Sequence, residues 1–573
     1  MDIQILSFND FHGNLKPPSS SSGRIVTGHQ LNSDGTFDAT TNAGGVEYLA
    51  THLREARVGN PNTVTVAAGD IIGASPLLSA AFHDEPTIEA MNALGLEASA
   101  VGNHEFDEGY KELLRMQNGG CLDDGTDGLN NQNSCATPDA FPGANFQMLA
   151  ANVKYAGTNN TILPSYWIKD FGGAKVGFIG MTLKETPSIV TAAGVAGLEF
   201  TDEVATANAL VPVLRAQGVK AIVVLVHQGG TPVAEPWTDV NGVTHAVNPT
   251  YDYTCAGGGT LAGDSAILPI AANLDPQIDV IISGHTHQPY VCNVPEPNGS
   301  QRLVTSASSF GRLFTETNLR FNTKSQDILR PSAESTNMIV SRSVTPAADE
   351  TSIIDKYSTL IAPIANKELG NITETLTRSA VGESTLGDLI ADAQVNDPSV
   401  VTPGKTPVVA FMNPGGIRTD LNFPKTDSEL VDGIVRYEEA FNVQPFNNYL
   451  VSMDMTGADI WSLLGQQWTK PNTGTNTKFL QVSKGLHYTV TGADTARVVT
   501  ALTINGVAVP KDATVYRIVT NNFLADGGDN FLAFKSGTDR YFGGLDIDGF
   551  AKYLPTVSPY TPKLPLDRIT QSP

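Results

Sequence analysis

The chain has 573 residues, of which 41% are hydrophobic and 17% charged, and this composition excludes a disordered or fibrous protein. Its 36 Lys and Arg residues against 59 Asp and Glu residues give a net charge of −23, which excludes the basic surface that binds nucleic-acid polymers. No apolar run approaches the ~20 residues that cross a bilayer, so we expect no transmembrane segment.

The first half of the chain predicts strands that alternate with helices. Short apolar runs predict strands at Ile3–Phe8, Val64–Ala68, Val176–Gly180, Ala221–Val226 and Val280–Ser283. Helical periodicity predicts helices at Val46–Arg57, Thr87–Leu94 and Thr201–Gln217. Alternation of this kind predicts an α/β domain in which helices are layered on a sheet core.

The second half is separated from the first by a polar break near residues 322–348. An amphipathic helix is expected at Asp349–Leu369 as a connector. Beyond it, a helix and several alternating strands predict a second, α+β domain; they lie at Gly387–Gln394, Leu450–Met455, Leu486–Val490 and Val515–Thr520. We therefore expect a domain at 1–325, a linker with the connector helix at 326–369, a second domain at 370–565 and a tail at 566–573.

The four cysteines fall into two pairs, each in a loop rich in Gly, Asn or Asp, and their spacing matches no zinc site. We favour two disulfides, Cys121–Cys135 and Cys255–Cys292, over free thiols. Disulfides are typical of exported proteins, so a periplasmic or secreted location is expected. No signal peptide is visible at the start of the sequence, and we expect that it has been removed.

Polar side chains follow five of the apolar stretches in the first half. Because groups beyond the carboxyl ends of strands converge on one crevice, these side chains are expected to meet. Seven of them offer imidazole, carboxylate or amide ligands, enough for two metal ions rather than one: Asp10, His12, Asp70, Asn103, His227, His285 and His287. Taken singly, each is also compatible with a helix cap or a structural histidine. Zn, Mn, Co, Mg or Fe would suit such a set.

The series D-x-H, GD, GNHE, H and GH-x-H resembles the calcineurin-like metallophosphoesterases, and the GG-V-x-x-LA string at Gly44–Ala50 resembles their 5′-nucleotidase branch. The resemblance implies that one metal ion is bound by Asp10, His12, Asp70 and His287. It implies that the other is bound by Asp70, Asn103, His227 and His285, so that Asp70 bridges the two. His104 is then the catalytic histidine, and Asp107 orients it.

Three motifs of the second domain resemble the nucleotide-binding loops of the same family. The NPGGIR motif at Asn413–Arg418 resembles the phosphate-contacting loop, which implies substrate contacts for Asn413 and Arg418. The motif at Gln444–Asn448 implies that Phe446 stacks on the base and that Asn448 also contacts the substrate. The motif at Asn522–Asp529 implies that Phe523 is the second stacking ring and that Asp529 binds the ribose. One departure concerns Gly382, where the family often has a further phosphate-binding Arg; Arg378 is a candidate replacement.

Together these features predict a two-domain, metal-dependent 5′-nucleotidase. It would hydrolyse nucleoside 5′-phosphates with a hydroxide that bridges the two metal ions. The expected partners are nucleotide substrates, and a monomer is favoured. The enzymatic alternatives are a 2′,3′-cyclic nucleotide phosphodiesterase and a UDP-sugar or nucleoside-diphosphate hydrolase with the same site. A nucleotide-binding or adhesive protein without turnover is the alternative from another class.

Overall fold

The computed structural model describes residues 1–18, 20–32, 36–125, 128–137, 139–256, 259–425 and 431–572. The chain divides into two compact units. The first unit comprises Met1–Pro187 and Gly194–Leu360, and the second comprises Ser188–Ala193 and the chain from Ile361 onward.

Two sheets form the centre of the first unit. The first has the order β20-β19-β1-β4-β5-β6, with β21 also paired to β19. Its strands are β1 (Asp2–Phe8), β4 (Thr63–Ala68), β5 (Ala98–Ala100), β6 (Gln147–Leu149), β19 (Leu313–Asn322), β20 (Asp327–Ile328) and β21 (Glu334–Ile339). The second has the order β17-β18-β16-β11-β9-β8. Its strands are β8 (Tyr166–Asp170), β9 (Lys175–Thr182), β11 (Ala221–His227), β16 (Val280–Ser283), β17 (Pro289–Pro295) and β18 (Gln301–Ala307).

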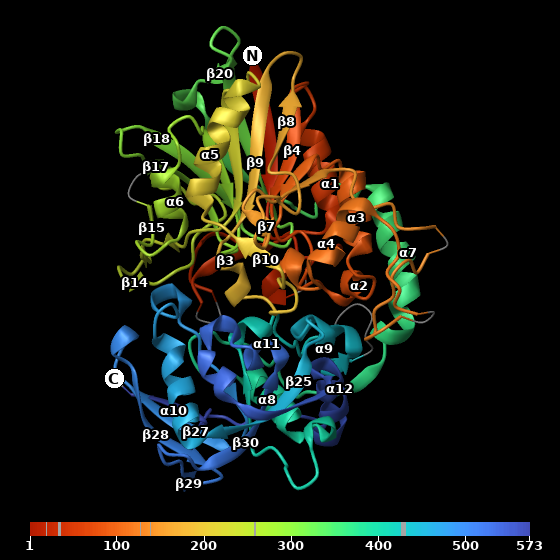
Figure 1. Ribbon diagram of the computed structural model, residues 1–573, viewed down its shortest axis with the longest axis vertical. Coiled ribbons are helices and arrows are strands. Elements are labelled where there is room, and N and C mark those ends of the chain that lie inside the picture. Colours follow the sequence, from red (N-terminus) through yellow and green to blue (C-terminus); the bar gives the residue numbers. More distant parts are fainter. Residues whose placement is uncertain are drawn as a thin grey trace. The chain divides into compact units, whose positions relative to one another are not determined.

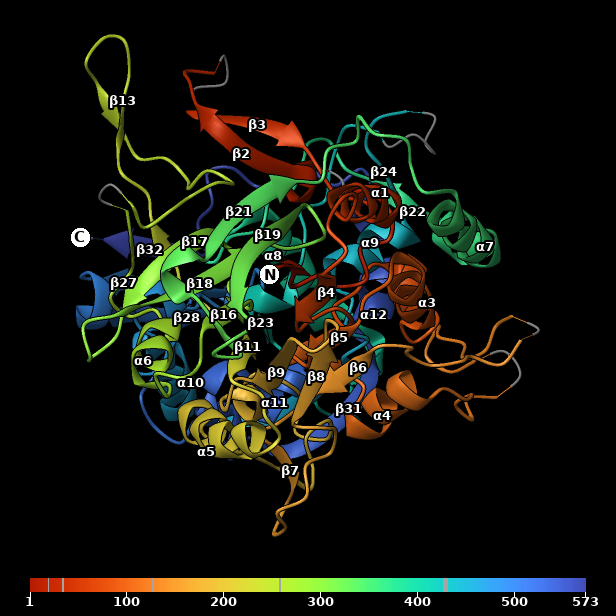
Figure 2. The same ribbon diagram turned by 90° about the horizontal axis from the view of Figure 1, so that it is seen from above.

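The two sheets pack face to face, because alternate residues of their strands share one core. Ile3, Ile5 and Val64 of the first sheet cluster with Val223 and Leu225 of the second. The intervening residues of β11 point the other way, where they pack on helices α5 (Glu203–Ala216) and α6 (Ile267–Asn273). Helices α1 (Val46–Ala56), α3 (Glu85–Leu94) and α4 (Tyr110–Asn118) lie on the opposite side of the paired sheets (Figures 1 and 2).

Strand direction places the carboxyl ends of the central strands at the same edge of each sheet. In the first sheet β1, β4, β5 and β6 run parallel. In the second, β9, β11 and β16 run parallel. The predicted α/β alternation is confirmed, and the edge at which polar residues were expected to converge exists in both sheets.

The second unit is built on two further sheets. A five-stranded sheet has the order β26-β23-β30-β25-β31, and a four-stranded sheet has the order β29-β28-β27-β32. The strands are β23 (Val409–Met412), β25 (Tyr449–Thr456), β26 (Gln481–Val482), β27 (Leu486–Thr491), β28 (Val498–Ile504), β29 (Val507–Ala508), β30 (Val515–Asn521), β31 (Thr538–Leu545) and β32 (Ile569–Ser572). The main helices are α8 (Thr385–Asn396), α9 (Tyr437–Val443), α10 (Gly457–Gly465), α11 (Asn522–Ala525) and α12 (Asp546–Val557).

The segments expected as linker and tail contain strands. Within 326–369, β21 pairs with β19 of the first sheet, although its sequence is polar. Helix α7 spans Ala348–Ala365, shorter than the predicted 349–369, because β22 (Glu368–Asn371) begins soon afterwards and pairs with β24 (Ile434–Arg436). Within the expected tail, β32 pairs with β27.

Both predicted disulfides are present, Cys121–Cys135 and Cys255–Cys292. The first closes a loop that follows α4, and the second joins residue 255 to β17. Among the described residues, no helix has both the length and the apolar character that a membrane crossing requires.

Removing the first disulfide should lower the stability of the first unit. A closed loop of about 15 residues contributes up to ~3 kcal/mol by restricting the unfolded chain. A Cys121→Ser, Cys135→Ser double variant should therefore unfold at a lower temperature in differential scanning calorimetry. The matched control is wild-type protein under reductant, which loses both disulfides and should unfold at a lower temperature still. An unchanged transition in the double variant would contradict the expectation.

Candidate functional site

The polar side chains singled out in the sequence lie at the carboxyl ends of the parallel strands. In the first sheet, Asp10 and His12 follow β1, Asp70 follows β4, and Asn103 and His104 follow β5. In the second sheet, His227 ends β11, and His285 and His287 follow β16. The two edges meet, because Nε2 of His227 lies 2.9 Å from Oδ2 of Asp70.

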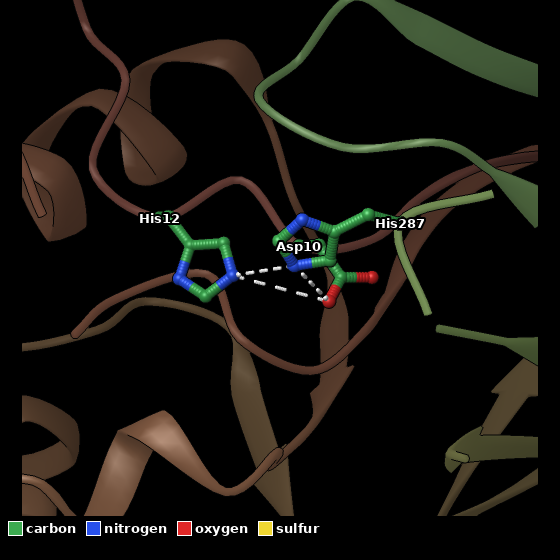
Figure 3. A group of neighbouring side chains, drawn as sticks. All are labelled: Asp10, His12 and His287. Atoms are coloured by element: carbon green, nitrogen blue, oxygen red, sulfur yellow. Dashed lines mark hydrogen bonds and ion pairs between the residues drawn. The ribbon is translucent and has the colours of Figure 1, made fainter. Parts of the chain in front are cut away.

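One group of side chains consists of Asp10, His12 and His287, whose ligand atoms point at one another (Figure 3). The Nε2 atoms of the two imidazoles are 3.1 Å apart, and Nε2 of His287 is 3.2 Å from Oδ1 of Asp10. Asp10 and His12 are fully buried, while the side chain of His287 is 27% exposed. Two imidazole nitrogens and a carboxylate oxygen facing one another are suited to a shared cation.

A second group consists of Asp70, His227 and His285, with Asn103 beside it. Nδ1 of His285 lies 3.1 Å from Oδ1 of Asn103. Nε2 of His227 is buried and faces Oδ2 of Asp70. Asp70 also lies near the first group, with Oδ2 3.7 Å from Nε2 of His12. All seven expected ligands are thus brought together, and Asp70 lies between the two groups.

Backbone carbonyls fix the imidazoles in the tautomer that a metal ligand needs. Nδ1 of His12 lies 2.8 Å from the carbonyl oxygen of Gly73, and Nδ1 of His227 lies 2.8 Å from that of Ala68. A carbonyl oxygen only accepts, so each Nδ1 must donate, which leaves the lone pair of the neutral ring on Nε2. Both Nε2 atoms are the ones directed at the carboxylates.

The electrostatics of the cluster favour positive charge between the carboxylates. Burial opposes ionisation of Asp10, but the imidazoles of His287 and His227 outweigh it and lower its pKa to about 2. Burial lowers the pKa of His285 to about 3, with help from His227, so this ring is neutral. Against burial, Asp70 and Asp10 raise the pKa of His227 to about 10. The two carboxylates thus stabilise the protonated, positively charged ring of His227. A divalent cation placed between them would compensate the same negative charge.

The backbone is unusual at five of the seven expected ligands, where φ lies between 48° and 70°. Only Gly, Asn, Asp and His adopt this left-handed region with any frequency, and residues held there cluster at functional sites. The five are Asp10, His12, Asp70, His285 and His287. Gly102 adds a close approach, because a Cβ at this position would lie 2.2 Å from Oδ1 of Asp70.

His104 lies at the rim of the cluster and contacts Asp107 as expected. Its Nδ1 is 2.8 Å from Oδ2 of Asp107, and the side chain is 14% exposed. Its backbone N–H donates to Oδ1 of Asp70 at 2.8 Å, and its ring centroid is 5.1 Å from that of His12. The backbone of His104 is therefore tied to the central carboxylate, while its ring is oriented by Asp107.

Two residues of the site were missed in the sequence. Glu105 is buried within the GNHE string, and its carboxylate accepts backbone N–H groups from Asp70 at 3.0 Å, Ile71 at 2.8 Å and Gly102. It thereby joins the loops after β4 and β5. Phe310 lies with its ring centroid 5.3 Å from that of His287, and its N–H donates to the carbonyl of Asp10 at 2.7 Å. Only the motif around Glu105 offered a sequence signal.

In the second unit, the three sequence motifs converge at one edge of the five-stranded sheet. The NPGGIR loop follows β23, and the loop with Phe523 and Asp529 follows β30, which is parallel to β23. The loop with Phe446 and Asn448 precedes β25, which is antiparallel to β30, so it starts at the same edge. Direct contacts join two of the loops.

A buried hydrogen-bond network connects Asn413 and Asp529. The Nδ2 group of Asn413 donates to Oδ2 of Asp529 at 3.1 Å, and its Oδ1 accepts from Nδ2 of Asn521 at 3.1 Å. Nζ of Lys478 lies 2.5 Å from the other carboxylate oxygen of Asp529. Asp529 itself has a left-handed φ of 54°. No motif or spacing had singled out Lys478.

Arg418 lies beside Phe446, with its guanidinium carbon 5.8 Å from the ring centroid. Its backbone N–H donates to the carbonyl of Val443 at 2.9 Å, which places the loop against the end of α9. Arg378 donates from Nη1 to the carbonyl oxygens of Ile417 and Arg418. Arg378 therefore supports the loop that carries Arg418.

The other residues that are expected to contact the nucleoside are half-buried or buried. Phe446 and Phe523 are half-buried, and the ring of Phe523 packs on the core of the unit. Asn448 is buried, and its carbonyl accepts from the N–H of Asp546 at 2.8 Å. Burial raises the pKa of Asp546 to about 7, against the hydrogen bond of the Asn448 side chain. Asn448 thus has a structural contact in addition to its predicted role.

The chain resembles known proteins over nearly its whole length. Residues 3–289 match the calcineurin-like phosphoesterase family, and residues 363–536 match the 5′-nucleotidase C-terminal domain. Cell wall protein Lmo0130 of Listeria monocytogenes is 33% identical over 96% of this chain, which spans 67% of that protein. Endonuclease YhcR of Bacillus subtilis is 31% identical over 91% of this chain, which spans 37% of that protein.

A similar fold occurs in the solved structure of a 5′-nucleotidase precursor from Thermus thermophilus. The TM-score is 0.73 at 23% identity, and the match covers 100% of this chain and 99% of that one. The chain therefore belongs to the calcineurin-like phosphoesterase family, in the branch with a 5′-nucleotidase C-terminal domain. Members of this family are metal-dependent phosphoesterases with a dinuclear divalent-metal site, and the two side-chain groups are its candidates. The resemblance seen in the sequence is confirmed.

Replacing Asp70 by Asn should weaken both candidate metal sites together. Asn keeps the size and tolerates the left-handed φ, so the variant removes mainly the charge that lies between the two groups. We expect the affinity for both ions to fall by more than the ~10–100-fold typical of lost outer partners. Metal content after buffer exchange, measured by mass spectrometry, tests this. The matched control is Asp170→Asn at the exposed end of β8, and loss of only one ion from Asp70→Asn would contradict the bridging role.

Proposed function

We propose that this protein hydrolyses nucleoside 5′-monophosphates to nucleoside and phosphate. The observation that carries the proposal is the pair of neighbouring ligand groups, with Asp70 of the second group 3.7 Å from His12 of the first, beside the His104–Asp107 pair. Support comes from the match of residues 363–536 to the 5′-nucleotidase C-terminal domain.

In this proposal the first unit performs the phosphoryl chemistry. Divalent cations, when bound, would neutralise negative charge on the phosphoryl group and activate the attacking water. Asp10, His12, Asp70 and His287 would hold one ion, and Asp70, Asn103, His227 and His285 the other. Asp107 accepts from Nδ1 of His104, so Nε2 is the atom that we assign to the phosphoryl group in the transition state.

The second unit would hold the nucleoside. We assign phosphate contacts to Asn413 and Arg418, stacking on the base to Phe446 and Phe523, and the ribose to Asp529. Aromatic rings bind every base through its flat face, so stacking alone favours no particular base. Asn448 would add a polar contact to the base, with its remaining hydrogen-bonding capacity.

The arrangement around Gly382 favours monophosphates over diphosphate compounds. Position 382 offers no guanidinium, and Arg378 donates to two backbone carbonyls of the NPGGIR loop. The alternative of a diester hydrolase is favoured by one comparison, since a relative at 31% identity is named an endonuclease. The net charge of −23 argues against a polymeric nucleic acid as substrate.

We infer that the protein acts outside the cytoplasm, in the periplasm or as a secreted protein. Two disulfides support this, because such bonds persist in oxidising compartments. A relative at 33% identity is named a cell wall protein.

The function is tested by chromatographic identification of the products formed from AMP, UMP, ADP, UDP-glucose and 2′,3′-cyclic AMP, because cleavage of a cyclic diester or of UDP-glucose need not release inorganic phosphate. Each substrate is assayed with Mn²⁺, Zn²⁺, Co²⁺ and Mg²⁺. We expect the largest kcat/KM for the two monophosphates, and no activity after chelation. Faster turnover of the cyclic or diphosphate substrates would favour the alternative, and no turnover of any would contradict the proposal.

His104→Ala should slow the reaction without loss of metal. The backbone N–H that binds Asp70 survives the substitution, while the ring with its assigned transition-state contact is removed. We expect kcat to fall by about 10²–10⁴-fold, the usual contribution of such a group. Turnover and bound metal are measured together on the same sample. Asp107→Asn should give a smaller loss, and a loss of both ions from His104→Ala would overturn the assignment.

A further inference from the structure

Lys478 forms a short ion pair with the carboxylate to which we assign the ribose. Its Nζ lies 2.5 Å from Oδ1 of Asp529, whose side chain is 5% exposed, while that of Lys478 is 27% exposed. The second oxygen of Asp529 accepts from Asn413 at 3.1 Å. The carboxylate is therefore held from both sides, and Lys478 is the more exposed partner of the ion pair.

The backbone places Lys478 firmly at this position. Its N–H donates to the carbonyl of Gln467 at 3.1 Å, and the next residue, Phe479, is fully buried against Trp468 at 5.6 Å between ring centroids. Asn472 donates from Nδ2 to the backbone carbonyl of Asp529 at 2.8 Å, so the loop at 466–480 is joined to the Asp529 loop independently of the ion pair. Lys478 is thus preorganised beside Asp529.

The two charged groups complement each other as hydrogen-bonding partners. A carboxylate only accepts and an ammonium group only donates, whereas a hydroxyl does both. Within the described part of the chain, Nζ of Lys478 donates only to Asp529, and it has three N–H groups. A hydroxyl placed against the pair can therefore donate to Asp529 and accept from Lys478 at once.

We propose that Lys478 and Asp529 together recognise the adjacent 2′- and 3′-hydroxyls of ribose, which makes Lys478 a specificity-determining residue for ribonucleotides over 2′-deoxyribonucleotides. The inference rests on the proposed function, in which the second unit binds a nucleoside. A role limited to neutralising a buried carboxylate would affect all nucleosides equally.

The test compares Lys478→Met and Lys478→Arg with a control, Lys484→Met, which changes an exposed lysine in the turn before β27. AMP and 2′-deoxy-AMP are the substrates. A hydrogen bond to a charged group corresponds to roughly 10–100-fold, so wild type should prefer AMP by about that factor. In Lys478→Met the ratio should approach one, mainly through a higher KM for AMP. Lys478→Arg should retain part of the ratio, and Lys484→Met all of it.

Binding of the nucleosides gives a readout that does not depend on hydrolysis. The Kd values of adenosine and 2′-deoxyadenosine are measured by calorimetry, with circular dichroism to check that each variant is folded. A ribose preference that disappears in Lys478→Met supports the inference, even if wild type hydrolyses no monophosphate and the proposed function fails. Equal binding of the two nucleosides by wild type, or an equal loss for both in Lys478→Met, overturns it.

Discussion

The first unit depends on the burial of two carboxylates, Asp10 and Asp70, at the ends of neighbouring parallel strands. Buried anions are costly unless compensating charge and hydrogen bonds surround them. Four imidazoles supply that surrounding, one from the first sheet and three from the second, and the carbonyls of Gly73 and Ala68 direct two of them. The second sheet contributes His227, His285 and His287. The cluster is therefore complete only when the two sheets are packed together.

The sequence predicted most of this because the first unit places its chemistry at strand ends. A run such as Ala221–Val226 identifies a buried strand, and the polar residue after it must lie at the sheet edge. Glu105 could not be given a role in this way, since its partners are backbone N–H groups of two separate loops. Strand β21 was also missed, because it lies at the edge of its sheet and its exposed, polar residues resemble a linker.

In the second unit the sequence identified the loops but not how they are held together. The motifs around Asn413, Phe446 and Asp529 were visible as strings, and the directions of β23, β25 and β30 explain why they share an edge. The contacts of Lys478 and of Arg378 were not predictable. A cation in a loop has no periodicity to reveal its partner, and both partners lie more than thirty residues away in the chain.

The left-handed backbone at five expected ligands restricts which amino acids those positions can accept. A glutamate at position 10 or 70 would offer the same charge, yet its longer side chain does not suit this conformation as Asp and Asn do. The left-handed backbone and the need for a cation-binding side chain therefore allow the same few residue types at these positions. Libraries that randomise these positions to alter the metal preference should therefore be limited to Asp, Asn, His and Gly.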